Sequence, residues 1–166
     1  MKIKILLIGG SRFVGPILVE LLLNRGHSLT IFNRGLLQSE YPMGVRFVKG
    51  DRDKGFNLKE RFDTVIDMCA YNGVQTKNAL RQLRFDFFLH FSTAAVYKKT
   101  NSFTLSESSP LGDWPLWGDY NKGKVECEKT LAVSGVKYAS LRPVYILGPK
   151  NYCDREYFIY SRIRNN

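Results

Sequence analysis

Two residues that can act together on a proton lie four positions apart, Tyr120 and Lys124. On a helix, this spacing puts both side chains on one face. A free tyrosine has a pKa of about 10, which is too high for a base at neutral pH, and a neighbouring ammonium lowers that pKa by favouring the phenolate. The pair is therefore a candidate acid–base site. The spacing alone leaves a surface tyrosine and lysine as the alternative.

A glycine-rich turn near the amino terminus is a second candidate site. It follows the apolar run 3–8 and precedes apolar residues at helical spacing between Val14 and Leu22. Glycines at a strand-to-helix turn let the backbone approach a pyrophosphate, and the helix dipole favours its negative charge. We therefore expect a dinucleotide to bind at this turn. Its residues are Gly9, Gly10, Ser11, Arg12, Phe13, Val14 and Gly15.

Strand-like and helical patterns alternate along the whole chain and must position these residues. Buried-strand patterns cover 3–8, 29–32, 45–48, 64–68, 87–91 and 138–141, and helical patterns cover 14–24, 77–83, 120–134 and 157–164. The polar segment 100–119 contains prolines and glycines, and it predicts a long loop. This alternation predicts an α/β fold, a Rossmann-type doubly wound parallel sheet.

The residues that end the second strand bear on which dinucleotide binds. Asn33 stands where NAD-selective proteins place an acidic residue for the ribose hydroxyls, and Arg34 follows it. An arginine fork suits a 2′-phosphate, so Arg34 together with Arg12 could clamp NADP. Two solvated loop arginines are the alternative. We expect NADP to be favoured over NAD.

The chain resembles the extended short-chain dehydrogenase/reductases of the NAD-dependent epimerase/dehydratase family. Gly9 and Gly15 match the outer glycines of that family's Gly-x-x-Gly-x-x-Gly turn. Arg12 replaces the middle glycine, and in this respect the turn is similar to the atypical branch that includes the chloroplast stem-loop-binding proteins. Segments 91–97 and 141–149 also resemble family segments, so the resemblance covers essentially the whole chain.

The resemblance implies roles for particular residues. Thr93 would hydrogen-bond the substrate oxygen while Tyr120 moves a proton, and Lys124 would also hold the nicotinamide ribose. Asp51 would lie near the adenine, with a turn or a helix cap as its alternative role. Residues 94–95, both alanine, stand where the related sugar 4,6-dehydratases carry Asp-Glu, which argues against dehydration.

The implied activity is that of an NAD(P)-dependent oxidoreductase or epimerase acting at a carbinol or carbonyl carbon of a nucleotide sugar. Two alternatives stay open: an RNA-binding protein with endoribonuclease activity, as in the atypical branch, or a cofactor-binding module without turnover. We expect an NAD(P)-binding domain at 1–149 and the start of a substrate lobe, or a tail, at 150–166. Because extended members continue much further, we expect most of that lobe to be missing and the exposed sheet edge to self-associate into a homo-oligomer.

Composition bears on the remaining classes of function. The net charge of +10 would attract RNA, but the basic residues are scattered, so RNA binding is the less favoured reading. There is no apolar stretch of 18 residues, so we expect no membrane span. Cys69, Cys127 and Cys153 have no metal-ligand spacing, which predicts no metal site and a reducing, cytoplasmic setting.

Overall fold

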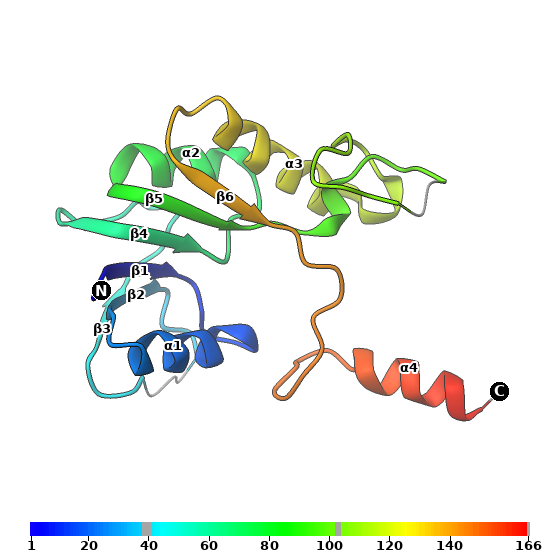
Figure 1. Cartoon of the computed structure of the whole chain (residues 1–166), viewed down its shortest axis with the longest axis horizontal. Coiled ribbons are helices and arrows are strands. Elements are labelled where there is room, and N and C mark those ends of the chain that lie inside the picture. The colour runs from blue at the N-terminus through cyan, green and yellow to red at the C-terminus, as the bar shows by residue number, and fades with distance from the viewer. Residues whose placement is uncertain (38–40, 102–103, 166) are drawn as a thin grey trace.

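The computed structural model describes residues 1–37, 41–101 and 104–165. Six parallel strands form one sheet in the order β3-β2-β1-β4-β5-β6 (Figure 1). The strands are β1 (Lys4–Ile8), β2 (Ser28–Asn33), β3 (Val45–Lys49), β4 (Arg61–Asp67), β5 (Arg84–Phe91) and β6 (Tyr138–Leu141). This order confirms the predicted Rossmann-type doubly wound sheet. The order reverses between β1 and β4, and the crevice beyond the carboxyl ends of these strands is where such folds bind ligands.

Helices cover both faces of the sheet (Figure 1). Along β1, successive side chains point to opposite faces, so Ile5 and Leu7 join the cluster on the side of α1 (Val14–Asn24). Leu6 and Ile8 join the cluster on the side of α2 (Gly73–Gln82) and α3 (Gly118–Ala132). The two apolar layers therefore explain why β1 is a continuous apolar run instead of an alternating one.

Several elements begin earlier than predicted, both helices and the strands β4 and β5, which start at Arg61 and Arg84 instead of 64 and 87. Helix α2 begins at Gly73, ahead of the predicted residue 77, because the Asn72 side chain caps it by accepting from the amide of Gln75. Helix α3 begins at Gly118, directly after a 3-10 helix at Pro115–Trp117. The predicted loop 100–119 is therefore shorter than expected, and its residues 102–103 lie outside the described residues.

The chain after β6 departs from the sheet. It runs as an irregular segment to helix α4 (Arg155–Arg164), which has no buried residue and stands apart from the sheet (Figure 1). The helix itself agrees with the predicted helical tail at 157–164. The division of the chain into units at 1–149 and 150–166 stays a prediction.

Candidate dinucleotide and catalytic site

The glycine-rich turn joins β1 to α1 at the carboxyl edge of the sheet. Gly9 and Gly10 have φ angles of 92° and 75°, a region that glycine adopts without strain. A Cβ on Gly15 would lie 2.1 Å from the carbonyl oxygen of Gly10, so glycine is required for α1 to start this close to the turn. Ser11 follows Gly10 and is half-buried. The cradle fits a pyrophosphate, which the amides at the start of α1 favour.

Residues 12–14 lead into α1 and contact the segment that follows β6. Phe13 directly precedes Val14, the first residue of α1. Its side chain is buried, and its backbone has a φ angle of 49°. Its ring lies 4.0 Å from the position that a Cβ on Gly148 would take. The Arg12 guanidinium lies over the ring of Tyr152, 5.6 Å from its centroid. Arg12 thus faces the segment after β6, and its sharing one phosphate with Arg34 stays a prediction.

Asn33 ends β2 and ties two turns together. Its Nδ2 donates to the carbonyl of Gly9 at 3.2 Å and to the hydroxyl of Tyr41 at 2.7 Å. Its Oδ1 accepts from the amide of Gly35 at 2.8 Å. Arg34, between the two bonded residues, is exposed. Asn33 therefore fixes the backbone that presents Arg34, a structural role that its type alone did not indicate.

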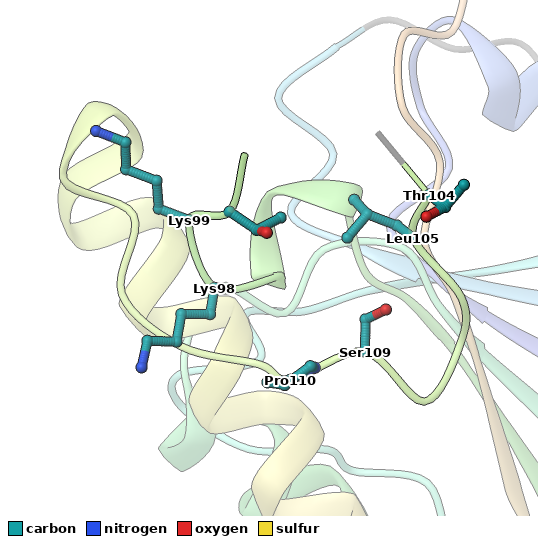
Figure 2. Close-up of a pocket in the computed structure, with 7 residues that line it drawn as sticks. Lys98, Lys99, Thr104, Leu105, Ser109 and Pro110 are labelled. Atoms are coloured by element: carbon teal, nitrogen blue, oxygen red, sulfur yellow. The ribbon is translucent and has the colours of Figure 1, made fainter. Parts of the chain in front are cut away.

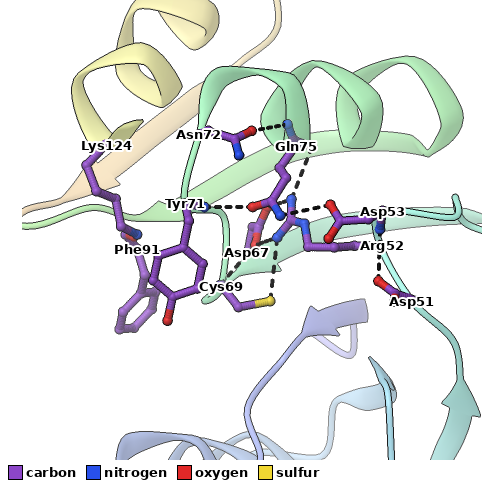
Figure 3. Close-up of polar contacts among 10 residues, drawn as sticks. All are labelled: Asp51, Arg52, Asp53, Asp67, Cys69, Tyr71, Asn72, Gln75, Phe91 and Lys124. Atoms are coloured by element: carbon purple, nitrogen blue, oxygen red, sulfur yellow. Dashed lines mark hydrogen bonds and ion pairs between the residues drawn. The ribbon is translucent and has the colours of Figure 1, made fainter. Parts of the chain in front are cut away.

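Asp51 and the residue after it occupy the loop that follows β3 (Figure 3). The Asp51 carboxylate accepts from the amide of Asp53 at 3.0 Å. This is the turn role given as its alternative, and contact with an adenine stays a prediction. Arg52 forms a buried bidentate pair with Asp67 at the end of β4, at 2.7 and 2.9 Å. Arg52 also donates to the sulfur of Cys69. The pair ties this loop to the carboxyl edge of β4.

The predicted catalytic residues come from the end of β5 and from α3. The hydroxyl of Thr93 accepts from the amide of Ala95 at 3.2 Å and begins a 3-10 helix at 94–96. Tyr120 and Lys124 both lie on α3, as their spacing predicted, and Tyr120 is 41% exposed. Lys124 is buried, its ammonium donates to the carbonyl of Phe91 at 2.6 Å, and burial lowers its pKa. Lys124 is thus bonded to the strand that leads to Thr93.

Tyr71 was not among the predicted site residues, yet it lies beside Lys124 (Figure 3) and also contacts Tyr120. Its ring centroid is 6.3 Å from that of Tyr120, and the Lys124 ammonium lies 5.5 Å from it. A Cβ on Gly123 would lie 2.0 Å from the carbonyl oxygen of Tyr71, so this glycine lets α3 approach. Burial raises the pKa of Tyr71. Its position after β4, beside the crevice, was the signal that could have indicated it.

A buried ion pair behind Lys124 was also missed. Glu128, one helical turn after Lys124, accepts hydrogen bonds from the hydroxyl of Ser92 and from the guanidinium of Arg142. Arg142 also donates to the hydroxyl of Tyr97 at 3.1 Å. The bond to Glu128 raises the pKa of Arg142. The network fixes α3 against the carboxyl ends of β5 and β6, and no local spacing indicated it, because Ser92, Glu128 and Arg142 come from three separate segments.

His90 is a buried titratable group next to this network. It lies on β5 in register with Asp67 of β4 and Ser140 of β6. Neither ring nitrogen has a hydrogen-bond partner among the described residues. Burial, with the positive charge of Lys124, lowers the pKa of His90 to about 4. The imidazole is therefore neutral at physiological pH.

Two hollows open on the surface near these residues. One, of about 510 Å³, is lined by Tyr71, Asn72, Asp119, Tyr120, Lys122, Gly123 and Glu126. The other, of about 310 Å³, lies in the loop before α3 and is lined by Lys98, Lys99, Thr100, Thr104, Leu105, Ser109 and Pro110 (Figure 2). Tyr71 and Tyr120 both line the first hollow. It is therefore the concave surface beside Tyr120, the candidate acid–base residue.

The described residues form neither a metal site nor a membrane-spanning helix. No group of three His, Cys, Asp or Glu side chains there is arranged to hold a metal ion. None of the described helices is both long and apolar enough to cross a membrane.

Sequence comparison gives one clear relative. No family model matches the chain. It is 30% identical over 180 aligned positions to the chloroplast stem-loop binding protein of 41 kDa b of Arabidopsis thaliana, an alignment that covers 97% of this chain and 47% of the relative. The chain therefore spans about half the length of the curated relative that it matches. That relative is chloroplastic by name, and a cytoplasmic setting for this chain stays a prediction.

Structural comparison finds an enzyme solved with NAD and UDP and a UDP-sugar epimerase. The WbmG enzyme of Bordetella bronchiseptica, solved with NAD and UDP, superposes with a TM-score of 0.76 at 19% identity, over 99% of this chain and 60% of that one. The UDP-N-acetylglucosamine 4-epimerase of Methanobrevibacter ruminantium gives 0.76 at 18% identity, over 100% and 64%. At such identities these matches show the fold. Together with the plant relative, they confirm the resemblance to the extended and atypical short-chain dehydrogenase/reductases.

Proposed function

We propose that this chain binds NAD(P) and takes part in oxidoreductase or epimerase chemistry at a carbinol or carbonyl carbon, with a nucleotide sugar as its substrate class. The observation that carries the proposal is the turn between β1 and α1, where Gly9 and Gly10 have positive φ angles and Gly15 touches the Gly10 carbonyl. A backbone cradle of this kind at a helix start serves a pyrophosphate. Structural neighbours solved with NAD and with UDP support both the cofactor and the substrate class.

Three side chains would perform the chemistry. When bound, a nicotinamide cofactor supplies the acceptor or donor of a hydride. Tyr120, at the mouth of the hollow, takes or returns the proton of the substrate hydroxyl, and Thr93 hydrogen-bonds the same oxygen. The Lys124 ammonium has three donors, and its bond to Phe91 leaves two for a ribose or for the tyrosine oxygen.

The catalytic part is tested by comparing two tyrosines of the same hollow. Tyr120→Phe removes the hydroxyl and should abolish hydride transfer on a panel of UDP-sugars while leaving cofactor affinity within about twofold. Tyr71→Phe is the matched control, because it keeps the ring beside Lys124 and should retain turnover. If Tyr120→Phe kept full turnover, Tyr120 would have a structural role instead.

The cofactor is proposed to be NADP in preference to NAD. The last position of β2 is Asn33, which has no acidic group for the ribose hydroxyls. Its side chain is already hydrogen-bonded to Gly9, Tyr41 and Gly35. Arg34 is exposed beside it, where a guanidinium can take a 2′-phosphate. Calorimetry should show tighter binding of NADP, and Arg34→Ala should cost NADP about 1.5 to 3 kcal/mol with little change for NAD. Equal affinities in the unmodified protein would refute this preference.

Helix α4 favours a second candidate function, RNA binding. It exposes Tyr157 and Tyr160 together with Arg162 and Arg164, and it carries the half-buried Arg155 in its first turn. Exposed rings stack with bases, and arginines neutralise phosphates. The stem-loop binding relative supports the same candidate. A hairpin RNA should then bind with an affinity that falls steeply with salt, and replacing the three arginines by glutamine should remove most of it.

Self-association remains a proposal of its own. Leu141 on the edge strand β6 is 45% exposed, and an unpaired strand edge of this kind favours association. Light scattering over a range of protein concentrations would check it, since a monomer at all concentrations would contradict the prediction.

A further inference from the structure

Lys49 lies at the same edge of the sheet as Arg34, although nothing in its sequence context singled it out. It is the last residue of β3 and pairs in register with Asn33, the last residue of β2. Its Cδ and Cε atoms lie 3.5 and 3.6 Å from the position that a Cβ on Gly35 would take. The aliphatic stem of Lys49 therefore crosses from β3 to the turn that follows β2.

That turn is held firmly in place. Gly35 adopts a left-handed φ of 64°, and its amide donates to the Asn33 side chain. The same side chain donates to the Gly9 carbonyl in the glycine-rich turn. Arg34 lies between Asn33 and Gly35, so its backbone is fixed relative to both the phosphate turn and the Lys49 stem.

The two cations are available for a ligand. The side chains of Arg34 and Lys49 are exposed, and neither side chain has a hydrogen bond or an ion pair with any residue that the structure describes. Arg46, on the same strand as Lys49, is paired with Glu60. The free charge of β3 is therefore concentrated at its carboxyl end, beside the turn that carries Arg34.

We propose that Lys49 is a specificity-determining residue, which binds the 2′-phosphate of the adenosine ribose of NADP together with Arg34. Two cations from neighbouring strands would bracket one phosphomonoester, Arg34 with its planar fork and Lys49 as a point charge. The inference rests on the proposed function, because it requires a dinucleotide in the turn between β1 and α1. It extends that function by giving β3 a share in the choice of cofactor.

The test uses two pairs of ligands, and the members of each pair differ by the 2′-phosphate alone. NADP, NAD, adenosine 2′,5′-bisphosphate and adenosine 5′-monophosphate are titrated by calorimetry into the wild-type chain, Lys49→Met and Lys59→Met. Lys49→Met keeps the aliphatic stem and removes the charge. Lys59 is an exposed lysine just before β4, so it lies near the amino-terminal ends of the strands, whereas Lys49 lies at their carboxyl ends. We expect Lys49→Met to weaken both 2′-phosphate ligands roughly tenfold and to leave the other two unchanged, with no effect of Lys59→Met.

The remaining outcomes separate the inference from the function beneath it. A loss that Lys49→Met imposes equally on all four ligands, or no loss at all, overturns the role of Lys49 while NAD(P) binding stands. The same holds if Lys59→Met matches Lys49→Met, because the effect would then come from overall charge. If the wild-type chain binds none of the four ligands, the proposed function itself fails. The 2′-phosphate loses its second charge below a pKa of about 6, so the tenfold difference should shrink at pH 5.

Discussion

The two halves of the sheet's carboxyl edge present their candidate residues in opposite ways. Around β1, β2 and β3, the backbone builds the cradle at Gly9 and Gly15, and the cations Arg34 and Lys49 are exposed beside it. Around β5, β6 and α3, the charged groups are buried: Lys124 is 4% exposed and Glu128 is 5% exposed. The first half therefore presents to solvent cations that the fold does not need, whereas the charged groups of the second half are part of the packing of the fold.

This contrast has an energetic consequence. An exposed cation pays little desolvation and contributes little to folding, so it can change with ligand preference. A buried charge is costly unless paired, and removing its partner leaves that cost in place. Substitutions near α3 should therefore change stability and chemistry together, while substitutions of the exposed Arg34 and Lys49 should change ligand affinity alone.

The largest expected effect comes from breaking the buried pair of Glu128 and Arg142. Glu128→Ala leaves the Arg142 guanidinium, 18% exposed, without its carboxylate, and should lower the free energy of unfolding by about 3 to 5 kcal/mol. Asp86→Ala is the matched control, because Asp86 and its partner Arg61 are 52% and 65% exposed, and it should cost under about 1 kcal/mol. Urea denaturation of both variants measures the difference, and similar losses would contradict the contrast.

The same contrast explains which parts could be predicted from the sequence. The glycine-rich turn was predictable, because its function depends on backbone geometry that glycines at 9, 10 and 15 specify locally. The central strands β1 and β2 were predictable because both of their faces are buried, and a strand of this kind is a continuous apolar run in the sequence. Tyr71 was not predictable from its type, because its contacts with Tyr120 and Lys124 depend on how closely α3 packs at Gly123. Lys49 was not predictable either, because its position beside Arg34 depends on the register that pairs it with Asn33.

The next effect is a pH dependence that His90 should impose on stability. Burial lowers its pKa to about 4 from the ordinary 6.5. Between these pH values the unfolded chain takes up a proton that the folded chain does not, so the free energy of unfolding falls as pH falls. Across this window the loss should be about 3 kcal/mol, and below pH 4 the contribution is constant.

Other groups also titrate in this range, so the measurement is a difference between variants. His90→Gln should remove the loss attributed to His90, and its stability should therefore fall less between pH 6.5 and 4 than that of the wild type. His27→Gln is the control, since His27 is the other of the chain's two histidines and is not buried in the core. If His27→Gln flattened the pH profile as much as His90→Gln, the buried imidazole would not be the source.

The smallest expected effects come from one substitution made in each half, and they test the contrast most sharply. Gly15→Ala and Gly123→Ala both add a methyl group to a helix, which by propensity alone would gain up to about 1 kcal/mol. In each case the new Cβ would lie about 2 Å from a carbonyl oxygen, that of Gly10 or that of Tyr71. The helix must shift, so both variants should lose about 1 to 3 kcal/mol of stability.

The functional losses should separate where the stability losses do not. Gly15→Ala moves the start of α1 away from the phosphate turn and should weaken NADP and NAD alike, because the pyrophosphate is common to both. Gly123→Ala moves α3 away from Tyr71 and should leave cofactor affinity nearly unchanged while lowering turnover, because Tyr120 and Lys124 shift with the helix.

Gly112→Ala is the control: its Cβ would make an ordinary 3.4 Å contact with the flexible Lys98 side chain, so it should stay within about 0.5 kcal/mol of the wild type. Calorimetric titration and thermal melts of the three variants give both readouts. Equal loss of cofactor affinity in Gly15→Ala and Gly123→Ala would mean that the two halves form one coupled site, since a shift of α3 would then reach the cradle of β1.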